Sequence, residues 1–170
     1  HDICKLGIGR TFQIPQSINE MTVWENILIG ALCHTSNVSV AMNKVEEMLD
    51  LCGMTDKRDM VAGKLNVAQK KRLEIARAMA TDPKLLLLDE TMAGLTATER
   101  KEAVDLIRKI NARGIAILTI EHNMDVVMTV SSRVVVLVSG RLLMVGTPDE
   151  VVSNPEVISA YLGGGSDEDD

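Results

Sequence analysis

Residues 85–88 are four consecutive leucines, and two carboxylates, Asp89 and Glu90, follow them directly. A short apolar run without polar alternation is typical of a strand buried on both faces, as in a parallel sheet that helices cover. Such sheets bind ligands beyond the carboxyl ends of their strands. The run therefore predicts an α/β fold with two carboxylates at the edge of the sheet where ligands bind.

A second apolar run, Ile115 to Ile120, ends in the same way, in Glu121 and His122. Between the two runs, Thr96 and Glu99 have the spacing of a capping box, which predicts a helix. The three segments form a strand–helix–strand unit, so we expect both strands to be buried and to present titratable groups at one edge. An imidazole at that edge is suited to contacting a phosphate or orienting a water.

The remaining segments continue the alternation of strands and helices. Thr22 with Glu25 and Asn66 with Gln69 have capping spacing, which predicts helices at 22–32 and 66–80. Helical periodicity and turn residues predict further helices at 40–52 and 123–131, two terminal helices that begin near Pro148 and Pro155, and strands at 7–12, 134–138 and 142–145. We interpret residues 1–162 as one largely parallel α/β domain with a helical subdomain at about 22–80, and residues 163–170 as a flexible acidic tail. The charged run Lys70 to Arg72 is interpreted as a solvated helix face.

Composition narrows the class of protein. The 170 residues are 46% apolar and 25% charged, which supports a packed core and excludes a disordered chain. The net charge is −6, and the last four residues supply four of the negative charges, which leaves −2 without them. This acidic balance argues against a nucleic-acid partner. The apolar runs are far shorter than the roughly 20 residues of a membrane span, and three cysteines without a CxxC spacing indicate a reducing, cytoplasmic setting.

In their order along almost the whole chain, the motifs resemble those of the nucleotide-binding subunit of ABC transporters. They are a Q-loop-like strand and glutamine at 9–13, a signature-like motif and helix at 65–78, a Walker-B-like strand with an adjoining glutamate at 85–90, a D-loop-like turn at 93–95 and a switch-like histidine at 122. The closing stretches 146–148, 154–155 and 160–163 are similar to the C-terminal sequences of the branched-chain amino-acid importers in this family. The resemblance implies a P-loop NTPase-like fold of the ABC ATPase type.

The resemblance also implies a site for ATP and Mg²⁺. Gln13 would sense the γ-phosphate and the metal, and Asp89 would hold Mg²⁺ through water. Glu90 would be the general base, and His122 would contact the γ-phosphate. Two ATP-binding subunits, identical or different, would sandwich two ATP molecules, each facing the partner's signature motif. Residues 14–26 would lie near the coupling helix of a transmembrane permease subunit, which would hold the chain at the inner face of the membrane without inserting it.

The signature motif departs from the LSGGQ or LSYGQ of the family. The residues that would face the partner's nucleotide are Leu65, Asn66, Val67, Ala68 and Gln69, together with Gly94 of the D-loop-like turn. Asn66 keeps a helix cap and an amide donor in place of the serine hydroxyl, whereas the β-branched Val67 is expected to crowd the phosphate. Thr91 stands where a proline is usual and is expected to loosen the turn.

The phosphate-binding loop is missing from these 170 residues, which contain no GxxxxGK[ST] sequence. Family domains carry that loop before the position of His1, so we expect an N-terminally truncated domain. In the family's arrangement the strand that feeds the loop would lie against the Walker-B-like strand. We therefore expect Leu85–Leu88 at an unpaired edge of the sheet.

Three hypotheses for the function follow. The first is a cytoplasmic ATP-binding subunit, or most of one, of an importer that resembles the branched-chain amino-acid type. The second is a catalytically inactive remnant that serves only as an interaction domain, because the phosphate loop is missing and the signature motif is altered. The third is an ABC-type ATPase of DNA repair or translation, which the acidic balance disfavours.

The 170-residue chain alone should not hydrolyse ATP, because positioning of the substrate dominates phosphoryl transfer and the chain has no phosphate cradle. Phosphate release should be measured with purified chain, ATP and Mg²⁺, with the Glu90→Gln variant as the control. The two proteins should release phosphate at the same background rate. A clear excess from the parent chain would contradict the prediction.

Overall fold

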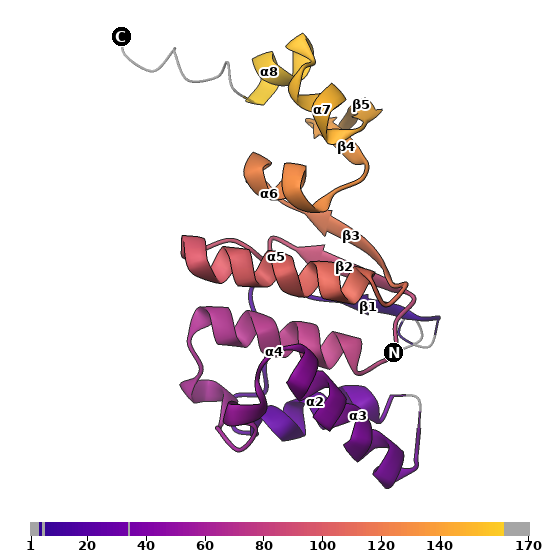
Figure 1. Ribbon diagram of the computed structural model, residues 1–170, viewed down its shortest axis with the longest axis vertical. Coiled ribbons are helices and arrows are strands. Elements are labelled where there is room, and N and C mark those ends of the chain that lie inside the picture. The colour runs from indigo at the N-terminus through magenta and orange to yellow at the C-terminus, as the bar shows by residue number, and fades with distance from the viewer. Residues whose placement is uncertain (1–3, 5, 34, 162–170) are drawn as a thin grey trace. The chain divides into compact units, whose positions relative to one another are not determined.

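The structure is a computed structural model that describes residues 4, 6–33 and 35–161. It divides into two units, residues 1–121 and residues 122–170, which are described separately (Figure 1). The tail that the sequence predicts at 163–170 lies outside the described residues.

A three-stranded parallel sheet lies at the centre of the first unit. Its strands are β1 (Ile8–Arg10), β2 (Leu85–Asp89) and β3 (Ala116–Ile120), in the spatial order β1-β2-β3. Helix α5 (Ala97–Asn111) connects β2 to β3. The predicted strand–helix–strand unit and the parallel α/β fold are therefore confirmed.

The order of the strands corrects two expectations about exposure. Leu85–Leu88 was expected at an unpaired edge, which is wrong, because β2 is the central strand and pairs with β1 on one side and β3 on the other. The second apolar run was expected to be buried, which is also wrong, because Leu118 and Ile120 are each 56% exposed. Among the described residues, β3 pairs with a strand on one side only. The exposed apolar edge is therefore that of β3.

Three helices pack together beside this sheet (Figure 1). They are α2 (Val23–Ala31), α3 (Val38–Leu51) and α4 (Val67–Met79), and two short 3-10 turns, Thr55–Lys57 and Ala62–Lys64, lie between α3 and α4. The capping boxes of Thr22 with Glu25 and of Asn66 with Gln69 are formed as predicted. At Gly30 a Cβ would lie 2.3 Å from the carbonyl oxygen of Arg77, so the close approach of α2 to α4 requires glycine there.

A buried asparagine ties the segment after β1 to α2. Asn26 is fully buried, and its Oδ1 accepts a hydrogen bond from the Ile18 amide at 2.9 Å. Its Nδ2 donates to the carbonyl oxygens of Ile18, at 3.0 Å, and Thr22, at 2.9 Å. A side-chain amide that replaces backbone partners in this way fixes an irregular segment that has no ladder of its own.

The described part of the second unit, residues 122–161, contains three short helices and a hairpin. In chain order these are α6 (Met124–Val130), β4 (Val134–Val138), β5 (Arg141–Gly146), α7 (Pro148–Val152) and α8 (Pro155–Tyr161). The strands are antiparallel, as the Ser139–Gly140 turn predicts, and both turn residues have positive φ. Val136, Val151 and Val157 form the buried core of the unit. None of the helices described in either unit has the length and apolar character to cross a membrane.

The exposed edge of β3 should make the 170-residue chain associate as its concentration rises, because an apolar strand with free backbone groups pairs with other chains. Leu118→Lys should suppress this association. Light scattering across a concentration series measures the association. Val40→Lys, which makes the same change at a 53% exposed position of α3, is the matched control and should associate like the parent. A monodisperse parent chain with cooperative thermal unfolding would contradict the prediction.

Candidate functional site

The turn after β2 begins at Glu90, directly after the last strand residue Asp89. Glu90 has a φ of +47°, in the left-handed region that residues other than glycine seldom adopt. Its amide donates to the carbonyl oxygen of Ile120 at 3.0 Å, and its own carbonyl oxygen accepts from the Ala93 amide at 3.2 Å. The tight turn therefore turns the chain away from the sheet directly after Asp89.

The structure brings Gln13 onto Glu90, although the two are far apart in the sequence. Gln13 Nε2 donates to Glu90 Oε2 at 2.7 Å. This contact follows from the parallel pairing of β1 with β2, since the carboxyl ends of neighbouring parallel strands lie at one edge. Two of the residues that the sequence predicts to act together are thus neighbours.

The carboxylate of Asp89 lies beside a cation. Its Oδ2 is 3.3 Å from Arg10 Nη2, and its side chain is 29% exposed. The Arg10 guanidinium in turn lies 5.0 Å from the centre of the Phe12 ring, in a cation–π contact. The Asp89 backbone is fixed by its amide, which donates to the Thr11 hydroxyl at 3.3 Å. Asp89 Oδ2 is therefore paired with the Arg10 guanidinium, and the carboxylate remains partly accessible to solvent.

Helix α4 fastens the loop that carries Gln13. Glu74 is 4% exposed, and its Oε1 accepts from the Gln16 amide at 2.8 Å while Oε2 accepts from the Phe12 amide at 3.5 Å. Arg77 Nη1 donates to the carbonyl oxygen of Gln16 at 2.8 Å. Burial raises the pKa of the Glu74 carboxyl. The sequence analysis missed both residues, although a carboxylate inside the apolar run 73–76 is a signal of this kind of buried contact.

Another residue of α4 corrects an interpretation. Lys70 to Arg72 was interpreted as a solvated face, which is wrong for Lys71, because this side chain is only 7% exposed. Lys71 and residues of α5 line one small cavity together with Thr91 and Met92 of the turn after β2. The middle of the charged run is therefore inside the first unit.

The signature-like residues form the N-terminus of α4. Gln69 donates its amide to Asn66 Oδ1 at 2.8 Å, and the Asn66 amide donates to Gln69 Oε1 at 3.1 Å. Val67 is 57% exposed, whereas Leu65 is only 6% exposed. Gly94 has a φ of +75°, and no atom lies where a Cβ would stand. Its left-handed backbone conformation, and not close packing, therefore favours glycine at this position. The first turn of α4 is thus capped by its own side chains, with Val67 projecting from it.

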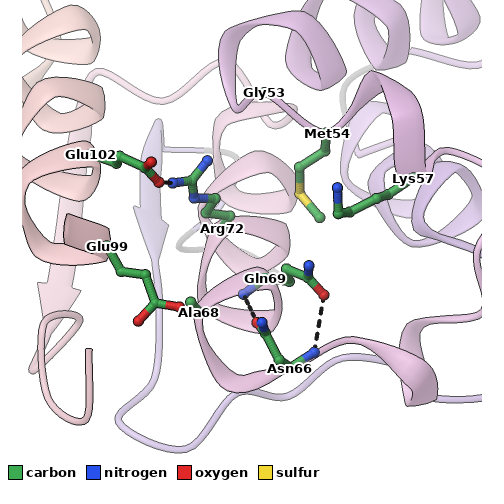
Figure 2. A pocket seen from close by; sticks show the side chains of 9 residues that line it. All are labelled: Gly53, Met54, Lys57, Asn66, Ala68, Gln69, Arg72, Glu99 and Glu102. Atoms are coloured by element: carbon green, nitrogen blue, oxygen red, sulfur yellow. Dashed lines mark hydrogen bonds and ion pairs between the residues drawn. The ribbon is translucent and has the colours of Figure 1, made fainter. Parts of the chain in front are cut away.

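A hollow of about 170 Å³ lies beside this helix end (Figure 2). Its lining residues are Gly53, Met54, Lys57, Asn66, Ala68, Gln69, Arg72, Glu99 and Glu102. Most of the charged side chains in this lining are paired. Arg72 forms an ion pair with Glu102, and Lys57 Nζ lies 2.5 Å from Asp56 Oδ2. The sequence analysis did not predict this hollow, which requires α4 and α5 to lie side by side.

The residues at the end of β2 suit a magnesium ion but not a triphosphate. Mg²⁺ keeps several waters and needs few protein oxygens, so the Asp89 carboxylate and the Gln13 side-chain oxygen are sufficient ligands in kind. No three His, Cys, Asp or Glu side chains gather closely enough for a metal site in the part of the chain that is described. The phosphate cradle has no counterpart in the 170 residues. His122 opens the second unit, and its role at a γ-phosphate remains a prediction.

The stability of Glu74→Gln relative to the parent should rise with pH, from the unfolded pKa of Glu74 through its raised folded pKa. The folded pKa of Glu74 lies above the unfolded value of about 4.3, so the contribution of Glu74 is most favourable below that value and is lost as the carboxyl ionises. Thermal unfolding at a series of pH values measures the difference between variant and parent. A difference that stays the same at every pH would refute the prediction.

Comparisons with known proteins agree with these features. Residues 2–93 match the family model described as ABC transporter, and residues 141–167 match the model described as branched-chain amino acid ATP-binding cassette transporter. The high-affinity branched-chain amino acid transport ATP-binding protein LivG of Escherichia coli K12 is 38% identical, across 95% of this chain and 69% of LivG. The corresponding protein BraF of Pseudomonas aeruginosa is 36% identical, across 96% of this chain and 70% of BraF.

The fold has solved counterparts. The crystal structure of the ADP conformation of an ATP-binding cassette of an ABC transporter superposes with a TM-score of 0.80 and 32% identity, across 95% of this chain and 70% of that one. A nucleotide-free ATP-binding cassette from an ABC transporter also gives a TM-score of 0.80, with 30% identity. With the family model, the identities and the fold in agreement, the chain belongs to the family of ABC transporter ATP-binding domains.

Proposed function

We propose that this chain is the ATP-binding part of an importer for branched-chain amino acids, in which ATP hydrolysis drives a transmembrane permease. The names of LivG and BraF support the class of solute, and so does the match of residues 141–167 to the branched-chain family model. A permease partner would place the chain at the inner face of the membrane. A second ATP-binding subunit, identical or related, would complete the pair.

The observation that carries the proposal is the contact of Gln13 with Glu90, which directly follows Asp89 at the carboxyl end of β2. Glu90 is the proposed general base, whose carboxylate would take a proton from an attacking water, and the Gln13 amide that donates to its Oε2 would orient it. Asp89 would hold Mg²⁺ through water, and Gln13 would face both metal and γ-phosphate. When bound, Mg²⁺ would neutralise charge on the phosphates.

The N-terminus of α4 is the part proposed to serve the partner's nucleotide. Residues 65–69 and Gly94 would face it, and residues 22–80 would form the helical subdomain that carries them. Asn66 and Gln69 use side-chain oxygens on each other's amides, so the capped turn offers the remaining first-turn amides to a phosphate. Val67, 57% exposed, projects from the same turn and would crowd that phosphate.

A second candidate function is that of an interaction domain that does not hydrolyse ATP. It is favoured by Val67 and Ala68, which stand where the family's signature motif has smaller glycines. The two candidates differ in what happens once a phosphate loop is supplied. Only the first predicts turnover that depends on Glu90.

The signature reversion distinguishes them. The chain should be fused to a GxxxxGK[ST]-bearing segment of an ABC ATP-binding domain, and its steady-state ATPase activity measured with the permease at saturating ATP. Asn66→Ser, Val67→Gly and Ala68→Gly together should raise kcat at least about tenfold, equivalent to about 1.4 kcal/mol, because a preorganised donor regains access to the phosphate.

Helix α3 offers a matched control, since Asn37 caps it and Val38 occupies its first turn. Asn37→Ser with Val38→Gly repeats two of the three changes away from the site and should leave kcat unchanged. Equal and fast turnover by the fused parent and its revertant would show that residues 66–69 are a working signature. No turnover by either protein would favour the interaction domain.

A further inference from the structure

A buried lysine of α4 holds the turn that carries Glu90. Lys71 Nζ donates to the carbonyl oxygen of Glu90 at 3.0 Å and to that of Ala93 at 2.7 Å, and the residue is 7% exposed. A buried ammonium is unfavourable unless its protons are hydrogen-bonded, so its retention inside the first unit calls for a reason. The two carbonyl oxygens it reaches are the first and last of the turn.

A carboxylate holds the same turn through its donors. Glu121 Oε1 accepts from the Met92 amide at 3.1 Å and lies 3.5 Å from the Thr91 hydroxyl. Thr91 and Met92 are 5% and 3% exposed. Thr91 was expected to loosen the turn in place of a proline, but its hydroxyl makes a contact with Glu121 that a proline cannot make. Every residue of the turn 90–93 thus has a contact with one of two opposite charges, the buried Lys71 or the half-buried Glu121.

The charges around the turn are complementary. The carboxylates that face the Lys71 ammonium are those of Glu121, Glu90 and Glu74, while burial lowers the pKa of Lys71. Burial raises the pKa of Glu121, which Lys71 opposes. These groups lie on α4, at the end of β3 and after β2, which are the elements packed around the turn. A positive φ at Glu90 is a conformation that surrounding contacts must enforce.

We propose that Lys71 and Glu121 are positioning residues, which hold the 90–93 turn between them so that the Glu90 carboxylate meets the Gln13 amide. Lys71 fixes the carbonyl oxygens at the two ends of the turn, and Glu121 fixes the donors between them. The catalytic consequence rests on the proposed function, whereas the holding of the turn is a property of the chain itself. Neither residue is assigned contact with nucleotide.

The test measures the turn directly, without nucleotide. Hydrogen exchange followed by mass spectrometry should be compared for peptides that contain residues 90–93, at one fixed pH, in the parent chain and in Lys71→Met. The variant keeps the length of the side chain and removes its donors. Exchange of these amides should become at least about tenfold faster. Carbodiimide labelling of Glu90 should rise in parallel, because its carboxylate leaves the Gln13 amide.

Two further variants separate positioning from bulk stability. Lys70→Met changes the neighbouring lysine of the same helix and should leave both measurements at parent values. Lys71→Arg keeps a cation with donors for the two carbonyl oxygens and should restore slow exchange and low labelling. If Lys71→Met loses exchange protection throughout the first unit, Glu121→Gln decides instead. This variant keeps the size of the side chain but removes the charge that strengthens its contacts with Thr91, Met92 and Lys71, so it should speed exchange only in the 90–93 peptides.

The proposal is overturned if Lys71→Met and Glu121→Gln both fold with parent exchange rates in the 90–93 peptides. It is also overturned if Lys70→Met loosens the turn as much as Lys71→Met does, or if Lys71→Arg fails to restore it. These outcomes are independent of ATP binding. Failure of the proposed function would therefore leave the result for the turn unchanged, and failure here would leave the proposed function to its own test.

Discussion

The parallel pairing of β2 between β1 and β3 is the constraint on which the candidate site depends. It places the carboxyl ends of the three strands at one edge, so that Gln13 after β1 reaches Glu90 after β2 at 2.7 Å. The side chains of Leu86 and Leu88 are buried in the core of the first unit, whereas Asp89, the last residue of β2, is partly exposed. The proximity of these side chains is therefore a consequence of how the strands are ordered.

Side chains of helix α4 contact both loops at that edge. Lys71, Glu74 and Arg77 recur every three residues along it; the first contacts the turn after β2, and the other two contact the loop after β1. Buried charges contribute little net stability, yet removing one partner of a buried pair typically costs about 3–5 kcal/mol. We attribute their presence to placement of the loops. The same helix carries the signature-like turn at its N-terminus, so one element both holds the loops of the proposed catalytic site and carries the proposed signature motif.

The sequence was sufficient to predict what local chemistry determines. The capping boxes at Thr22, Asn66 and Thr96 were predicted because each depends on two residues three apart, and the β2 strand because its leucines have no polar neighbour to alternate with. The exposed edge was assigned to the wrong strand, because strand order depends on pairing between distant segments. Lys71 was missed for the same kind of reason, since its burial depends on α5 and on the turn after β2, which no pattern within residues 65–78 reveals.

The central claim is that Asp89 and Glu90 have separate roles at one site for Mg²⁺ and ATP. The most direct test measures ATP affinity with and without Mg²⁺, together with turnover, in the domain completed with a phosphate loop. Glu90→Gln should keep Mg²⁺-dependent binding and lose at least about a hundredfold in turnover, whereas Asp89→Asn should lose the Mg²⁺ dependence of binding. Parent-like turnover in Glu90→Gln, or an unchanged Mg²⁺ dependence in Asp89→Asn, would contradict the account.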